Sequence, residues 1–139
     1  MTVAGERPPL TELTADFQKV LCVVAHPDDI EYGLSAAVDR WTTAGAQVSY
    51  FLLTRGEAGI ATMPPEQAGP LREAEEIESA RVVGVTDVRF GDHRDGCVEF
   101  GGALRRDIAR QIRRVQPDLV VAGTSEVKFP GGFLNQADH

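Results

Sequence analysis

The stretch that decides the fold is residues 20–31, Val-Leu-Cys-Val-Val-Ala-His-Pro-Asp-Asp-Ile-Glu. Residues 20–25 form an unbroken apolar run, which is typical of a parallel strand buried on both faces. The run leads directly into His26, Asp28 and Asp29. Because ligands of open α/β sheets bind at the carboxyl ends of the strands, these three side chains are expected to form part of a site.

Outside this stretch, the apolar pattern alternates between strand and helix. It predicts three further strands, at residues 47–53, 86–90 and 118–123. It also predicts three helices, at about 32–44, 70–83 and 102–115. Such alternation predicts a Rossmann-like α/β fold in three layers, with a mostly parallel sheet and right-handed crossovers. All strand-to-helix loops then lie on one rim of the sheet, and the residues they carry include His26, Arg55, Asp95 and His139.

Length and composition are those of one globular domain. The chain has 139 residues, of which 42% are hydrophobic and 25% charged, and we expect a domain over 18–139 after an N-terminal tail at 1–17. A net charge of -7 argues against nucleic acid or an anionic membrane as the main partner. Five arginines between 105 and 114 fit the solvated face of a helix. No signal peptide or spanning apolar stretch is found, so a cytoplasmic location is expected, and a homo-oligomer is left open.

The donors after the first strand suit a metal ion. His26 offers a neutral nitrogen and Asp29 a hard oxygen, a combination that favours zinc or another divalent first-row metal. A catalytic zinc site uses three protein ligands, so a further donor is needed, and the closing residues 136–139, Gln-Ala-Asp-His, contain one. The alternative is that Asp28 and Asp29 only cap a helix that begins near Glu31, but capping explains one aspartate and not the adjacent histidine.

Several motifs carry a family resemblance. Residues 25–31, Ala-His-Pro-Asp-Asp-Ile-Glu, resemble the Ala-His-Pro-Asp-Asp-x-Glu signature of the PIG-L type (LmbE-like) N-acetylglucosaminyl deacetylases. Residues 54–59, Thr-Arg-Gly-Glu-Ala-Gly, are similar to the loop after that family's second strand, and 71–75 to the start of its next helix. Asp95-Gly96 resembles a substrate-facing Asp-Gly, and Asp138-His139 the end of a His-Pro-Asp-His element.

The resemblance implies a hydrolase that removes acetyl from an N-acetylated amino sugar or cleaves a related small amide. By resemblance, His26, Asp29 and His139 would bind Zn²⁺ and Asp28 would act as general base toward the attacking water.

The resemblance also implies a set of substrate-binding residues: Arg55, Arg72 and Asp95. Arginines could bond sugar hydroxyls or a phosphate, and the alternative for them is ion pairing with glutamates on a helix surface.

The closing element departs from the family pattern. Gln136 stands where the family has a histidine that steadies the oxyanion, and Ala137 replaces the proline. A glutamine can donate an N–H bond to an oxyanion but cannot carry a proton, so Gln136 takes that catalytic role in our prediction. The resemblance stops at His139, whereas the family normally continues, so the fold is expected to be incomplete at the C-terminus. We therefore expect these residues to be the front part of a longer polypeptide, or the remainder to be supplied by another chain.

Two other function classes are compatible with parts of this sequence. A non-catalytic metal- or carbohydrate-binding module, or an inactive fragment of the enzyme, is favoured by Gln136 and stays open. A nucleotide-dependent oxidoreductase could share the strand and helix alternation, but no Gly-x-Gly-x-x-Gly follows the first strand.

Overall fold

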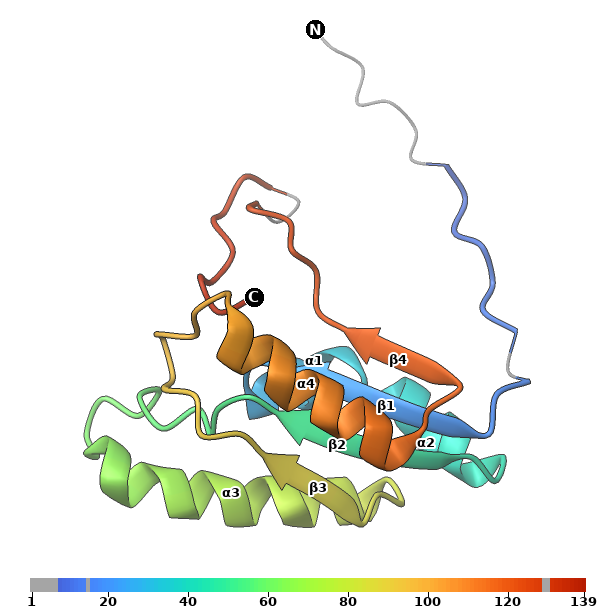
Figure 1. Ribbon diagram of the computed structural model, residues 1–139, viewed down its shortest axis with the longest axis horizontal. Coiled ribbons are helices and arrows are strands. Elements are labelled where there is room, and N and C mark those ends of the chain that lie inside the picture. Colours follow the sequence, from blue (N-terminus) through green and yellow to red (C-terminus); the bar gives the residue numbers. More distant parts are fainter. Residues whose placement is uncertain (1–7, 15, 129–130) are drawn as a thin grey trace, which may run out of the picture.

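Four parallel strands form one sheet at the centre of the molecule (Figure 1). The structure is a computed structural model that describes residues 8–14, 16–128 and 131–139. The strands are β1 (Lys19–Val24), β2 (Gln47–Leu52), β3 (Asp87–Phe90) and β4 (Leu119–Ala122), in the order β3-β2-β1-β4. Each pairing is parallel, which confirms the predicted α/β class.

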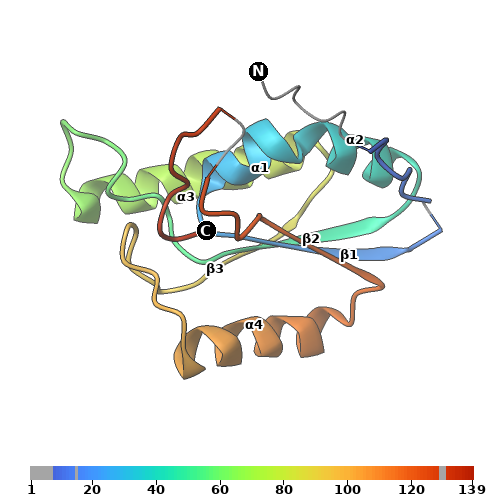
Figure 2. The same cartoon turned by 90° about the horizontal axis from the view of Figure 1, so that it is seen from above.

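Helices cover both faces of the sheet (Figure 2). On one face lie α1 (Pro27–Gly33), α2 (Ser35–Thr43) and α3 (Pro65–Val82), and on the other lies α4 (Gly102–Val115). The core is divided in the same way, because alternate residues of a strand point to opposite faces. Val20, Cys22 and Val24 of β1 pack beneath the three-helix layer, whereas Leu21 and Val23 pack with apolar residues of α4.

The strand β1 is central and bonded on both sides. It pairs with β2 and with β4, and its residues Val20, Leu21 and Cys22 are fully buried. The buried parallel strand predicted from the apolar run is therefore confirmed, and it delivers His26 at its carboxyl end.

The first predicted helix is wrong in its start and its continuity. A single helix was expected from about residue 32, but α1 already begins at Pro27 and is separated from α2 at Leu34. The fixed φ of Pro27 suits a first helical turn. The backbone N–H of His26, just before the helix, donates to Asp29 Oδ2 at 2.9 Å, so one carboxylate does cap α1.

The second predicted helix also begins too late. Pro70 was expected near the start of this helix, yet α3 begins at Pro65 and Pro70 lies inside it. The amides of Gln67 and Ala68 both donate to the carbonyl of Pro64, which closes a helical turn before Pro70 is reached. The pair of prolines at 64 and 65 therefore lies at the start of this helix.

The strand order places a crevice beside β1. The chain runs outward from β1 to β2 and β3, and then returns to place β4 on the other side of β1. Such a reversal is the usual binding place of an open α/β sheet, since connections leave the two strands in opposite directions.

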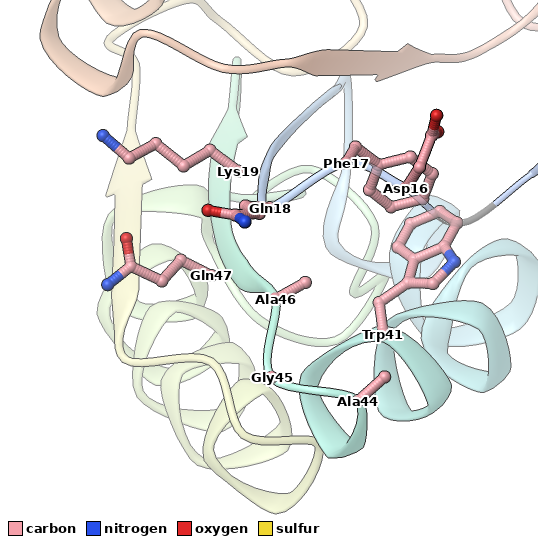
Figure 3. Close-up of a pocket in the computed structure, with 9 residues that line it drawn as sticks. All are labelled: Asp16, Phe17, Gln18, Lys19, Trp41, Ala44, Gly45, Ala46 and Gln47. Carbon is pink, nitrogen blue, oxygen red and sulfur yellow. The ribbon is translucent and has the colours of Figure 1, made fainter.

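A second hollow, of about 610 Å³, lies at the opposite, amino end of the strands (Figure 3). Phe17 meets Trp41 there edge to face, with ring centroids 5.3 Å apart, while Lys19 and Gln47 extend away from this pair. None of the predicted site residues lines it. Among the described helices, none combines the length and the apolar character needed to cross a membrane.

Candidate metal centre

A hollow of about 720 Å³ lies at the carboxyl ends of β1 and β4, where the strand order reverses. One wall is apolar and includes Val23, Leu53 and Ile108. Most of the polar side chains that line it come from α1 and from the end of the chain, and they include Asp28, Asp29, Gln136, Asp138 and His139. The crevice therefore holds residues that are more than 100 positions apart in the sequence.

The three predicted ligands lie close together: Asp29 and His139 line this hollow, and the buried His26 lies beside Asp29. Asp29 lies between the two imidazoles: its Oδ2 is 3.4 Å from His26 Nδ1 and its Oδ1 is 3.0 Å from His139 Nε2. One atom from each residue lies within 4.8 Å of the others. Tetrahedral zinc with bonds of about 2.0–2.1 Å keeps neighbouring ligand atoms roughly 3.3–3.4 Å apart, so the spacing suits such an ion.

Hydrogen bonds on the far side of His26 determine which nitrogen is free. Its Nε2 is 2.8 Å from Asp138 Oδ2 and 3.1 Å from Asp95 Oδ1. Because an ionised carboxylate only accepts, Nε2 must carry the proton, and in the neutral ring Nδ1 then presents a lone pair to Asp29. In zinc proteins, histidine ligands are oriented in the same way, by a carboxylate that binds the ring nitrogen opposite the metal.

Both oxygens of the Asp138 carboxylate have hydrogen-bond partners, which fixes the carboxylate beside the His26 ring. Besides His26, its oxygens accept the backbone N–H of Gly96 at 2.7 Å and of Val98 at 2.9 Å. Its position explains why His26, Asp95 and Asp138 form a second cluster of ligand-type atoms. We interpret that cluster as the support of His26 rather than as a second metal site.

The electrostatics of the centre favour a cation between the ligands. A hydrogen bond with Asp29 is the main cause that raises the pKa of His26 to about 9; burial opposes the shift, and Asp138 and Asp95 add to it. Burial works against ionisation of Asp29, but hydrogen bonds from His26 outweigh it and hold the pKa of Asp29 below its ordinary value. Without a metal a proton is drawn into this space, and the donor set of two imidazoles and one carboxylate fits zinc.

The two predicted catalytic side chains are accessible on the same rim. Asp28 is exposed, and it also borders a smaller hollow of about 340 Å³ that includes Arg72. Gln136 lines the main hollow. These positions leave both side chains free to reach a bound molecule, and their catalytic roles stay predictions.

Arg55 and Arg72 both lie against other parts of the protein. Arg55 Nε donates to Glu73 Oε2 at 2.6 Å and its Nη1 to the carbonyl of Gly91 at 3.1 Å, so the ion-pair alternative describes its present contacts. Arg72 lies so close beneath the loop that a Cβ added to Gly56 would meet its Nε at 3.0 Å. Their substrate-binding role stays a prediction.

Asp95 faces the support of the metal ligands. Besides its contact with His26, its Oδ2 accepts the backbone N–H of Ala58 at 2.9 Å. Both oxygens of Asp95 therefore have partners within the protein. The predicted contact of Asp95 with substrate stays a prediction.

Three residues that support the site are not among the residues predicted from the sequence. Glu57 accepts the backbone N–H of both Arg55 and Asp95 and so ties two loops together. The sequence indicates Asp138 only as part of a motif. It gives no prediction for Asn135, whose Oδ1 is 2.7 Å from His139 Nδ1. The spacing of four residues between Asn135 and His139 is the only sequence signal for that contact.

Comparisons with known proteins agree with this geometry. A family model described as PIG-L, GlcNAc-PI de-N-acetylase, matches residues 21–139. The diacetylchitobiose deacetylase of Thermococcus kodakarensis is 36% identical over 118 residues, which cover 84% of this chain and 44% of that protein. A probable N-acetyl-alpha-D-glucosaminyl L-malate deacetylase 2 of Bacillus anthracis is 32% identical over 127 residues, with 86% and 54% covered.

The fold is likewise shared with a solved structure. The N,N'-diacetylchitobiose deacetylase from Pyrococcus horikoshii, complexed with its inhibitor, superposes with a TM-score of 0.81 and 29% sequence identity. The match covers 89% of this chain and 46% of that one. The chain thus spans about half the length of the relatives it matches.

Proposed function

The chain belongs to the PIG-L family, and from that membership we propose that it forms the zinc-binding part of a hydrolase that deacetylates an N-acetylated amino sugar or a related small amide. The observation that carries the proposal is that ligand atoms of His26, Asp29 and His139 lie within 4.8 Å of one another. The two relatives above that act as deacetylases by name support the substrate class.

Each residue has a task in that reaction. Zinc, when bound by His26, Asp29 and His139, supplies Lewis acidity and lowers the pKa of water. Asp28, exposed on the rim, accepts the proton of the attacking water and returns it to the departing amine. Gln136 donates a side-chain N–H to the oxyanion that develops on the amide carbonyl.

Zinc content and amine release test the proposal together. Metal-free chain is refilled with zinc, and bound zinc is measured by elemental analysis in the wild type, in His26→Ala and in Asp28→Ala. We expect about one zinc per chain in the wild type and in Asp28→Ala, and a loss in His26→Ala, because His26 is a ligand and Asp28 is not. Amine release from an N-acetylglucosamine conjugate should fall by at least about 100-fold in Asp28→Ala. Full activity of that variant would disprove the base role, and a wild type without zinc would disprove the metal centre.

A second candidate function rests on Gln136. Because this residue stands in place of a histidine, the chain could serve as a metal- and carbohydrate-binding module without turnover. Calorimetry would then show that the zinc-loaded chain binds the conjugate while no amine is released. Release of amine would decide for the hydrolase.

A further inference from the structure

The closing segment of the chain folds back on itself to bring His139 to the hollow. Lys128 and Leu134 form an antiparallel bridge, and the backbone N–H of Asn135 donates to the carbonyl of Val127 at 2.9 Å. Asn135 therefore lies at the base of this loop, one turn before His139. Its side chain is in position to act on both the loop and the histidine.

Backbone partners fix the orientation of the Asn135 amide. Its Nδ2 donates to the carbonyl of Glu126 at 2.9 Å, and its Oδ1 accepts the backbone N–H of Gln136 at 2.9 Å. A flipped amide would bring its NH₂ group against the N–H of Gln136 and its oxygen against a carbonyl, which loses both bonds. The atom that faces His139 is therefore the oxygen.

The orientation of that amide determines the tautomer of His139. Asn135 Oδ1 is 2.7 Å from His139 Nδ1, and an amide oxygen can only accept, so Nδ1 must carry a proton. In the neutral ring Nε2 is then unprotonated, and it is this nitrogen that lies 3.0 Å from Asp29 Oδ1. A lone pair of His139 and a carboxylate oxygen thus face each other, which calls for a cation between them.

We propose that Asn135 is the positioning residue of His139: its side-chain oxygen fixes the ring and the Nδ1–H tautomer, so that Nε2 is presented to the metal. The inference rests on the proposed metal centre. It gives each histidine ligand its own support, since Asp138 holds the opposite nitrogen of His26. Asn135 directly precedes Gln136 and Ala137, the two positions at which this chain differs from the family pattern.

Two substitutions separate positioning of His139 from anchoring of the loop. Asn135→Ala removes the bond to His139, the bonds to the carbonyls of Glu126 and Thr124, and the bond from the Gln136 N–H. Asn135→Asp also loses the donor to the two carbonyls but keeps an oxygen that accepts from Nδ1 and from the Gln136 N–H. A comparison of the two variants therefore separates loss of the acceptor oxygen from loss of the donor that anchors the loop, and the tautomer of His139 reports the contact with the histidine. Circular dichroism checks that both fold, which we expect because Asn135 belongs to neither core cluster.

The first measurement needs no metal. Long-range ¹H–¹⁵N correlation reports which nitrogen carries the proton; it is recorded on metal-free chain labelled at histidine nitrogen, at a pH where the ring is neutral. The chain carries Asp29→Ala, because the carboxylate 3.0 Å from Nε2 would otherwise compete for the proton. In this background we expect the Nδ1–H tautomer of His139 with Asn135 intact and with Asn135→Asp, and a loss of that single tautomer with Asn135→Ala. An unchanged spectrum in Asn135→Ala would overturn the inference.

The second measurement is zinc affinity by chelator competition. Asn135→Ala should bind zinc about 10–100-fold more weakly than the wild type. The zinc affinity of Asn135→Asp should stay within a few-fold of the wild-type value. Equal weakening in both variants would show loop anchoring instead and would overturn the inference. A wild type that binds no zinc would remove the proposed metal centre, while the tautomer measurement would still decide the contact between Asn135 and His139.

Discussion

Glu76 is a charged side chain in a core position. It lies on α3 with 1% of its surface exposed, and neither carboxylate oxygen has a hydrogen-bond partner among the residues that the structure describes. Burial, and then the nearby Glu31 carboxylate, raises the pKa of Glu76 to about 8, with Arg72 opposing the shift. The buried hydroxyl of Tyr50 also lacks a partner within the described ranges. The polar groups beneath α1 are therefore incompletely satisfied, which costs stability.

The raised pKa of Glu76 predicts that stability falls as the pH rises. Between its ordinary pKa of 4.5 and about 8, the folded chain keeps a proton that the unfolded chain has lost, so unfolding becomes easier across that window. Glu76→Gln should leave stability nearly unchanged at pH 5 and raise it by about 1–3 kcal/mol at pH 8.5, because no buried charge has to form. Urea unfolding at a series of pH values measures this difference.

Glu75→Gln is the matched control for this prediction. Glu75 is the neighbouring glutamate of α3 and its side chain is exposed, so its substitution should shift the pH profile by no more than about 0.5 kcal/mol. Parallel pH profiles of stability for the wild type and Glu76→Gln would show that the carboxyl of Glu76 has an ordinary pKa. Our interpretation of the buried Glu76 would then be wrong.

At the scale of elements, strands were predicted more closely than helix starts. The run at residues 20–25 indicates a strand because apolar residues occupy both faces, a property of the sequence itself. The start of α1 depends instead on one proline and on the bond between Asp29 and the His26 amide. Its seven residues are too few for a helical period to be recognised, so periodicity detected only the region of α2.

The turn after β3 gives a test at this scale. A Cβ on Gly91 would lie 2.9 Å from the carbonyl oxygen of Leu53, a backbone atom that cannot rotate away. Gly91→Ala should therefore destabilise the chain by about 1–3 kcal/mol, as overpacking does. It should also disturb the loop that carries Asp95 to His26, so zinc affinity should fall together with stability. Urea unfolding and chelator competition measure the two effects.

Gly102→Ala serves as the control for that substitution. Gly102 is the first residue of α4, and a Cβ there would meet no atom within 4 Å. Alanine is also the better helix former, so stability should stay constant or rise by at most about 1 kcal/mol. If Gly91→Ala were equally harmless, the close approach of β3 to the end of β2 would not be present in solution.

At the scale of the whole molecule, the site joins the two ends of the described domain. The motif at residues 26–29 was predictable because three ligand-type residues follow one strand. The supports of the histidines were not, since Asp138 lies 112 residues from His26 and only the parallel order of β1 and β4 brings them together. Asn135 shows the same limit at short range, because four residues of spacing in a loop do not fix where side chains point.

This connection predicts that zinc stabilises the whole chain. A ligand that binds only the folded state adds about 2.7 kcal/mol when its concentration is 100 times its Kd, so the melting temperature should rise with zinc. The rise should vanish in His26→Ala and in His139→Ala. It should persist in His93→Ala, because the third histidine pairs with Asp107 at 2.8 Å and belongs to neither group of ligand-type atoms. A rise that survives both ligand substitutions would mean that zinc binds elsewhere.

The same binding should release a proton. In the metal-free chain the pKa of His26 is raised to about 9, so at pH 7 its ring is protonated, and zinc must displace that proton to use Nδ1. The gain in melting temperature should therefore shrink as the pH falls from 8 to 5, because protons compete more strongly for the ligands. Calorimetric titration at pH 7 in two buffers of different ionisation enthalpy should give a release of about one proton per zinc, and His93→Ala should give the same value. No dependence of the measured heat on the buffer would show that zinc does not displace a proton from His26.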